Sequence, residues 1–287
     1  NFETSTYGKW ILAGEHAVLR GCPALVFPLL THKLLLRYTV GSESLQASYA
    51  GPSGQTMRWL FWSVLERGLE LLSLSLNAIS GTFYLESNIP LGVGMGASAA
   101  LCVAVARWFS AQDLLATEKI YSFAKQLEHL FHGKSSGLDI AGVSATQGVI
   151  FQQDTVEPIA QTWKPCWGLS SCGQLGVTSH AIEQVSALWK RDAALGACID
   201  QQMRDSVSLA QQSLARDNAL QDLVHSVRNA ADCFQAWGLL SPPLQQHIQY
   251  LYEAGALAVK PTGSGGGGYV LSIWEQPMPE LDILWIH

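Results

Sequence analysis

The chain lacks an excess of positive charge and a long apolar run. Its 17 Lys and Arg face 23 Asp and Glu, which leaves a net charge of −6. A nucleic-acid-binding surface needs a basic footprint, and this composition supplies none. No stretch reaches the roughly 18 consecutive apolar residues of a membrane-spanning helix. We therefore expect neither nucleic acid nor a membrane as a partner.

Closely spaced cysteine pairs are also missing. The six cysteines form no C-x-x-C pair and show no metal-binding spacing with histidine. This usage is typical of reduced, mostly buried thiols and predicts a cytoplasmic protein. The 287 residues, 48% of them apolar, are enough for one large or two medium-sized domains with real cores.

The most informative stretch that is present covers residues 88–100. Gly92, Gly94 and Gly96 alternate with apolar residues and lead through small residues into an apolar segment that begins at Ser98. Glycine permits positive φ and a close approach of the backbone to a ligand. A helix that starts at such a loop directs unpaired N–H groups and a positive dipole end at the ligand. The stretch therefore predicts a phosphate-binding loop, with a plain turn between a strand and a buried helix as the alternative.

Two other phosphate motifs fail in their contexts. Gly263, Gly265 and Gly268 fit G-x-G-x-x-G, but the residues that follow form a predicted strand rather than a helix. Residues 133–135 resemble the end of a P-loop, but Glu128 occupies the position of its leading glycine.

Periodicity and residue type predict an α+β protein with two domains. We expect strands at residues 9–13, 33–40, 81–86, 148–152, 256–260 and 269–274. We expect helices at residues 57–74, 98–112, 117–132, 180–190, 197–214, 219–237 and 243–254. The boundary is predicted within residues 153–164, which gives domains 1–155 and 156–287.

Four motifs occur in a fixed order, at residues 8–25, 88–100, 128–139 and 260–269. Together they resemble the motifs of the GHMP small-molecule kinases, and within that superfamily those of the mevalonate kinases. The resemblance extends from about Lys9 to Tyr269. It implies a two-lobed GHMP kinase fold, with an N-lobe like the second domain of ribosomal protein S5, a ferredoxin-like C-lobe and a site in the cleft between them. It also implies ATP and Mg²⁺ as cofactors and phosphorylation of the 5-hydroxyl of mevalonate in isoprenoid biosynthesis.

The resemblance places Asp139 and Lys9 at catalytic positions. Phosphoryl transfer needs a group that orients the attacking hydroxyl and accepts its proton, which a carboxylate can do. A lysine beside it would keep the carboxylate ionised and offset charge on the phosphoryl oxygens. From the residues alone, Asp139 also fits an Asx-turn or a helix N-cap, and Lys9 a solvated strand start.

The same resemblance assigns the nucleotide and the metal. The expected nucleotide-binding residues are Pro90, Gly92, Gly94, Gly96, Ala97, Ser98 and Ala99. Ser98 and Glu128 are the expected Mg²⁺ ligands, because Mg²⁺ prefers one or two hard protein oxygens together with phosphates and water. Ser98 also fits an N-cap, which is compatible with metal binding, and Glu128 a solvated helix carboxylate.

Five residues are expected to bind the acceptor substrate: Glu15, His16, Thr262, Gly263 and Gly265. A lone histidine in apolar surroundings is more often structural than functional, so that alternative stays open for His16. The chain departs from the usual pattern at Ala97, where the family has serine, and at Ile140, where mevalonate kinases usually have asparagine. Both departures leave details of substrate binding open.

Other functions compatible with the motifs are phosphomevalonate kinase, sugar kinase, and a catalytically silent relative that binds nucleotide or isoprenoid. The pair Ala17-Val18 replaces the Thr-Asp of galactokinases and disfavours a sugar. Phosphomevalonate adds roughly two negative charges to the acceptor, yet the only cations near the motifs are Lys9, Arg20, Lys134 and Lys260. This favours the less charged mevalonate. The oligomeric state stays open, with a homodimer as one expectation.

Overall fold

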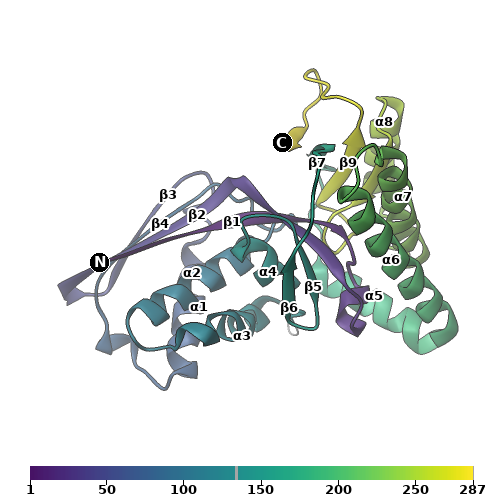
Figure 1. The fold of residues 1–287 in the computed structure, drawn as a ribbon. Coiled ribbons are helices and arrows are strands. Elements are labelled where there is room, and N and C mark those ends of the chain that lie inside the picture. Colours follow the sequence, from purple (N-terminus) through teal and green to yellow (C-terminus); the bar gives the residue numbers. More distant parts are fainter. Residues whose placement is uncertain (133–134, 287) are drawn as a thin grey trace. The chain divides into compact units, whose positions relative to one another are not determined.

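The structure is a computed structural model that describes residues 1–132 and 135–286 (Figure 1). The strands are β1 (Phe2–Ala13), β2 (Ala24–Ser44), β3 (Gln46–Ala50), β4 (Ser80–Ser87), β5 (Val149–Gln152), β6 (Thr155–Pro158), β7 (Cys166–Ser171), β8 (Ala258–Pro261), β9 (Tyr269–Trp274) and β10 (Leu284–Ile286). The α-helices are α1 (Arg58–Leu71), α2 (Ala97–Ala111), α3 (Ile120–His132), α4 (Leu138–Ser144), α5 (Thr178–Arg191), α6 (Ala193–Leu214), α7 (Leu220–Ala236) and α8 (Pro242–Glu253). Within the described ranges, no helix combines the length and apolarity needed to cross a bilayer.

The chain folds into two compact units that are interleaved in sequence. Unit 1 comprises residues 1–9, 28–91 and 95–146, and unit 2 comprises residues 10–27, 92–94 and 147–287. Strands β1 and β2 each pass from one unit into the other along the chain. The sequence analysis predicted two continuous domains, 1–155 and 156–287. The two compact units are discontinuous in sequence and are a different kind of division, so the domain boundary stays a prediction.

In unit 1, β4 pairs with two neighbours. Its partner β2 is antiparallel, with Leu36 opposite Leu85, and its partner β3 is parallel, with Tyr49 opposite Leu85. Side chains of β4 alternate between exposed and buried, as expected for a strand with one face on a core. The buried face contributes Phe83, which packs against Tyr38 and Trp108 with ring centroids 4.8 and 4.9 Å away.

Helix α2 is the centre of the helical layer in unit 1 and packs against α1, α3 and α4. Its residues 99–106 are all buried, so it is apolar on every side rather than amphipathic. Gly68 of α1 makes room for a side chain of α2, because a Cβ there would lie 2.4 Å from the Phe109 ring.

Unit 2 contains a four-stranded antiparallel sheet in the order β10-β7-β9-β8. Helix α7 packs against β8 and lies beside α6, and α5 packs against α6 (Figure 1). The first residues of β2 pair with β5 in the same unit, with Leu25 opposite Ile150, and β5 continues the pairing to β6.

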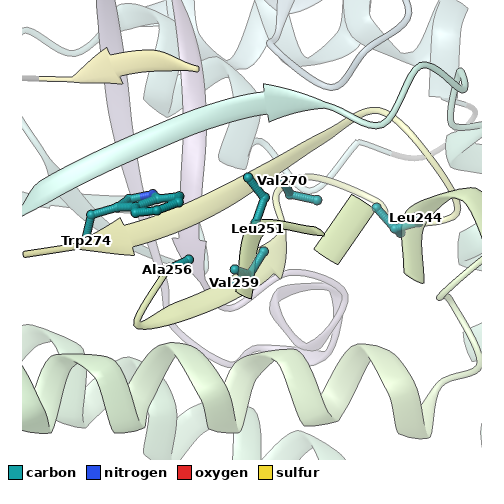
Figure 2. Packing of buried hydrophobic residues seen from close by; sticks show 6 residues of the cluster. All are labelled: Leu244, Leu251, Ala256, Val259, Val270 and Trp274. Atoms are coloured by element: carbon teal, nitrogen blue, oxygen red, sulfur yellow. The ribbon is translucent and has the colours of Figure 1, made fainter. Parts of the chain in front are cut away.

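A hydrophobic cluster joins α8 to strands β8 and β9 of unit 2. Figure 2 shows its members from close by: Leu244, Leu251, Ala256, Val259, Val270 and Trp274. Leu244 and Leu251 are fully buried and lie two helical turns apart on α8, so one face of the helix covers the strands. Trp274 donates its indole N–H to Ser272, 2.8 Å away, which satisfies the polar group inside the core.

The predicted helices and strands are all present, but the sequence analysis missed several short elements. These are β3, β6, β7, α4 and β10. Strands of three to six residues carry too short a pattern to separate from loops. The sequence analysis left Asp139 in an Asx-turn or at a helix N-cap, whereas it lies in the first turn of α4, whose N-cap is Gly137. Helix α4 itself was not predicted. It forms because Gly137 adopts φ +90° as its N-cap and because Leu138, Ile140 and Val143 are buried.

Candidate active site

Lys9 and Asp139 form an ion pair in unit 1. Lys9 lies on β1, its side chain is 2% exposed, and its Nζ is 2.8 Å from Oδ1 of Asp139. The Asp139 side chain is 30% exposed, so the buried cation approaches a carboxylate that remains reachable from solvent. The Lys9 backbone N–H donates to the carbonyl of Met95 at 2.9 Å, which fixes the strand to the glycine loop. The two predicted catalytic residues are thus brought together.

Asp139 lies in the first turn of α4, two residues after the N-cap. A carboxylate at this position is favoured by the positive end of the helix dipole. The turn before the helix is held by two serine hydroxyls, which accept from the backbone N–H groups of Gly137 at 3.0 Å and Leu138 at 3.2 Å. The backbone that carries Asp139 is therefore fixed before any substrate binds.

Glu128 provides a second carboxylate in unit 1. It lies on α3, is 1% exposed, and its Oε2 accepts the hydroxyl of Ser135. Burial raises the pKa of the Glu128 carboxyl to about 8, and the nearby charge of Asp139 adds to this rise. The Ser135 hydrogen bond and the Lys9 ammonium lower the same pKa. A buried carboxylate beside another is electrostatically costly without a cation.

The residues of this cluster fit a divalent cation. Oε1 of Glu128 is buried and has no hydrogen-bond partner within the described part of the chain, which is unusual for a carboxylate oxygen. Residues 1–132 and 135–286 contain no group of three or more His, Cys, Asp and Glu suited to a metal. A cation held here would therefore take few protein oxygens and complete its shell with phosphates and water, as Mg²⁺ does.

The predicted phosphate loop has the expected backbone. Gly92, Gly94 and Gly96 have φ of +76°, +81° and +80°, a region that side chains other than glycine rarely adopt. Gly96 is the N-cap of α2, so no side chain occupies the helix entrance. A Cβ on Gly96 would lie 2.8 Å from Cγ of Lys9 and 2.9 Å from Val143. This glycine therefore permits the close packing of Lys9 against the loop.

The residues that follow Gly96 differ in burial. Ala97 and Ala99 are buried, 5% and 0% exposed, whereas Ser98 is partly exposed. The N–H groups in the first turn of α2 have no acceptor within the helix. Ala97 stands where the family usually has serine. Its side chain is buried, so the helix begins here without a hydroxyl at this position. Pro90, also predicted to bind nucleotide, is partly exposed in the loop before Gly92.

In unit 2, Glu15 forms a buried ion pair. Its Oε1 lies 2.5 Å from Nζ of Lys260, and the two side chains are 2% and 0% exposed. Lys260 also donates to the carbonyl of Ile11 at 3.3 Å and lies over the ring of Phe234. The pair joins the end of β1 to β8. In this structure Glu15 is engaged by the protein itself, and its role in acceptor binding stays a prediction.

His16 is buried in the turn after Glu15. Its φ is +58°, its Nε2–H donates to the carbonyl of Ser264 at 2.8 Å, and its ring packs edge-on against Phe234 and Trp237. Burial lowers the pKa of His16 to about 4, so the ring is neutral near pH 7. The structural alternative that the sequence left open for His16 is supported by these contacts, while acceptor binding stays untested.

The glycine run 263–268 is shaped by close packing within unit 2. A Cβ at Gly265 would meet Phe234 at 3.0 Å, and one at Gly267 would meet the carbonyl of Leu175 at 2.8 Å. The hydroxyl of Thr262 bonds both backbone polar groups of Ile11, at 2.9 and 3.1 Å. Gly263 instead lies against Gly94, with a Cβ–Cα separation of 3.6 Å. The two predicted glycine loops therefore meet in unit 2.

Comparisons with known proteins identify relatives in sequence and in fold. Residues 60–147 match the family described as GHMP kinases N terminal domain. The mevalonate kinase of Aeropyrum pernix is 29% identical over 293 residues, covering 95% of this chain and 88% of the relative. That of Archaeoglobus fulgidus is 28% identical, covering 96% and 93%. The crystal structure of L. major mevalonate kinase in complex with R-mevalonate superposes with a TM-score of 0.80 at 22% identity, covering 96% and 88%.

The chain thus resembles the GHMP kinases, whose N-terminal-domain family it matches over residues 60–147. It is accordingly an ATP-dependent small-molecule kinase with the two-lobed GHMP kinase fold. The matched family region, residues 60–147, contains the glycine loop, Glu128 and Asp139. The C-terminal glycine run and Lys9 lie outside it.

Two partners of the predicted site residues were missed by sequence reasoning. Ser135 was quoted only as part of a motif, yet its hydroxyl contacts Glu128. Lys260 was counted only as a nearby cation, yet it pairs with Glu15. Ser135 precedes Gly137 by two residues, a spacing typical of serine turns, which could have indicated a structural role. Nothing local in the sequence connects Lys260 with a residue 245 positions away.

Proposed function

We propose that this chain transfers the γ-phosphoryl group of ATP to the 5-hydroxyl of mevalonate, giving 5-phosphomevalonate and ADP. The observation that carries the proposal is the Lys9–Asp139 ion pair, 2.8 Å long, in which a buried ammonium faces a solvent-reachable carboxylate. The pair lies in the same unit as the start of α2 and Glu128. The similarity to mevalonate kinases over 95% of the chain supports the choice of acceptor.

Each residue has a distinct task in this reaction. Asp139 accepts the proton of the attacking hydroxyl as the new O–P bond forms and the bond between the γ-phosphorus and the ADP oxygen breaks. Lys9 places a positive charge beside the oxygens on which negative charge develops. The N–H groups at the start of α2 hold phosphate oxygens.

Glu128 and Ser98 would hold Mg²⁺, which neutralises charge on the phosphates when bound. The buried Oε1 of Glu128 is available for this purpose. Ser98 contributes a neutral oxygen from the first turn of α2. Because Glu128 is deeply buried, its carboxylate is better stabilised with the cation than without it.

The charge of the described cations favours mevalonate over phosphomevalonate. Lys9 is paired with Asp139, Arg20 with Asp200 through two hydrogen bonds of 2.5 and 2.7 Å, and Lys260 with Glu15. Lys134, the fourth cation counted near the motifs, lies outside the described residues. Each of these three positive charges is therefore offset by a carboxylate of the protein. An acceptor with a single carboxylate matches this balance better than one with an additional phosphate.

Turnover measurements test the acceptor. ADP release is followed with mevalonate, phosphomevalonate and galactose at saturating Mg·ATP, with Asp139→Asn as the control for contaminating kinases. We expect kcat/KM for mevalonate to exceed the others by at least about 100-fold, since an unmatched buried polar contact typically discriminates at that level. A preference for phosphomevalonate or galactose would contradict the assignment of mevalonate as the acceptor. Binding of nucleotide without any turnover would instead indicate a silent relative. A cytoplasmic location and a homodimer stay predictions.

A further inference from the structure

Ser135 links Glu128 to the turn that carries Asp139 through a single hydroxyl group. It lies just before α4 and is 8% exposed. Its Oγ donates to Oε2 of Glu128 on α3 and accepts the backbone N–H of Gly137 at 3.0 Å. Gly137 is the N-cap of the helix whose first turn carries Asp139. One side chain thus contacts Glu128 and the backbone that positions Asp139.

The chemistry of these contacts fixes the direction of the Ser135 hydroxyl. A backbone N–H can only donate, so the bond from Gly137 uses a lone pair of Ser135 Oγ. The single hydroxyl hydrogen is then directed at Glu128 Oε2. A carboxylate held at one oxygen has its plane constrained, and the other oxygen is left to meet a different partner. Here that other oxygen, Oε1, is buried and has no hydrogen-bond partner within the described ranges.

We propose that Ser135 is a positioning residue that orients the Glu128 carboxylate so that Oε1 can ligate the divalent cation. The inference rests on the proposed kinase function, which assigns Glu128 to the metal. The new element is that the turn before α4 sets the orientation of the Glu128 carboxylate. The same turn positions the backbone of Asp139, so the two carboxylates are oriented together. Residues that hold metal ligands by hydrogen bonds typically change metal affinity by 10- to 100-fold when they are removed.

The chain offers a matched control in the next residue. Ser136 is also a serine of the turn before α4, and its Oγ accepts the N–H of Leu138 at 3.2 Å. Its hydroxyl thus supports the same turn, while the hydrogen bond to Glu128 comes from Ser135. Loss of Ser136 therefore reports on the turn, and loss of Ser135 reports on the turn together with the orientation of Glu128.

The test measures Mn²⁺ binding by electron paramagnetic resonance in the presence of ADP and without acceptor, so that it does not depend on turnover. We expect Ser135→Ala to weaken Mn²⁺ binding by about 10-fold or more. Ser135→Thr, which keeps the hydroxyl, should restore the affinity to within about threefold of wild type, and Ser136→Ala should stay within about twofold. In activity assays, Ser135→Ala should need more Mg²⁺ for half-maximal rate, with kcat at saturating Mg²⁺ changed less.

Equal Mn²⁺ affinities for Ser135→Ala and Ser136→Ala would overturn the proposal, as would a failure of Ser135→Thr to restore binding. If Ser135→Ala does not fold, the comparison of Ser135→Thr with Ser135→Cys, which offers only a weak donor, decides by the same measurement. A Glu128→Gln background gives a further criterion: loss of the Ser135 hydroxyl should then have little additional effect on Mn²⁺ binding. The Mn²⁺ affinities are measured without acceptor, so they would be the same if the acceptor were not mevalonate. The experiment therefore distinguishes failure of this proposal from failure of the acceptor assignment.

Discussion

At the residue scale, the main feature is a set of charged side chains that the protein itself pairs before any ligand binds. Lys9 with Asp139 and Lys260 with Glu15 each place an ammonium beside a carboxylate in surroundings where the lysine is 2% exposed or less. A buried charge without a partner is strongly destabilising, whereas a paired one is tolerated. Of the two pairs, only the first has a carboxylate open to solvent, as the catalytic role proposed for Asp139 requires.

Replacement of Asp139 by Asn tests its role as a general base. The amide is nearly isosteric with the carboxylate but cannot accept the hydroxyl proton, so kcat should fall by about 10²–10⁴-fold. Affinity for ATP, measured by fluorescence titration, should change little. The corresponding change at a partly exposed carboxylate of unit 2, Asp222→Asn on α7, should leave kcat unaffected. A kcat for Asp139→Asn close to wild type would contradict the assignment.

Burial of His16 predicts a defined pH dependence of stability. The unfolded chain binds a proton at this residue below about pH 6.5, whereas in the folded state the pKa is about 4. As pH falls from 6.5 to 4, the unfolded state gains protons that the folded state does not. At about 1.36 kcal/mol per pKa unit, the loss in the free energy of unfolding reaches about 3 kcal/mol.

Urea unfolding at a series of pH values measures this effect. The free energy of unfolding of wild type should decrease more steeply between pH 6.5 and 4 than that of His16→Gln, which cannot be protonated. The exposed His225 on α7 provides the control, and His225→Gln should keep the wild-type slope. Parallel slopes for wild type and His16→Gln would show that the folded protein protonates this ring normally.

At the element scale, the glycine loop and α2 act as one unit because Gly96 is at once the helix N-cap and the surface against which Lys9 packs. Glycine is required there for two separate reasons, its φ of +80° and the absence of a Cβ. Left-handed backbone costs other residues about 1–2 kcal/mol. The steric reason is separate, because a Cβ at this position would displace Lys9, the lysine proposed to act in catalysis.

A comparison of Gly96→Ala with Gly173→Ala separates the cost of the positive φ from the cost of a Cβ beside Lys9. Gly173 has nearly the same φ, +77°, but nothing lies within 4 Å of its Cβ position. We expect both variants to lose about 1–2 kcal/mol of unfolding free energy from backbone strain. Gly96→Ala alone should also lower kcat by at least about 10-fold, because a displacement near 1 Å is costly in a catalytic site. Equal kcat values in the two variants would argue against a tight fit of Lys9 to the loop.

At the scale of the whole molecule, the chain forms two compact units, each with its own core. In unit 1 the core centres on α2, and in unit 2 one cluster lies between α8 and strands β8 and β9. Leu101 on α2 and Leu251 on α8 are both fully buried. Removal of a buried leucine side chain typically costs about 2–5 kcal/mol, most of it felt where the cavity forms.

Hydrogen exchange can show whether each core stabilises mainly its own unit. Leu251→Ala should reduce amide protection in α7, β8 and β9 more than in α2 and α3, and Leu101→Ala should give the opposite pattern. The two variants act as controls for each other, because the same side-chain atoms are lost. A uniform loss of protection across both units in each variant would mean that the molecule unfolds as a single cooperative unit.

The sequence by itself determined the helices and longer strands, the glycine loops and the resemblance to GHMP kinases, because periodicity and contiguous motifs are local properties of the chain. It also selected Lys9, Asp139 and Glu128 as a group, although only through the resemblance. Tertiary structure decided what lies beside each of them. The pairing of Glu15 with Lys260, the hydroxyl of Ser135 on Glu128 and the packing of Gly96 on Lys9 depend on the positions of separate elements. Such contacts follow from the three-dimensional fold, since no local pattern records which distant residue will occupy the space next to a side chain.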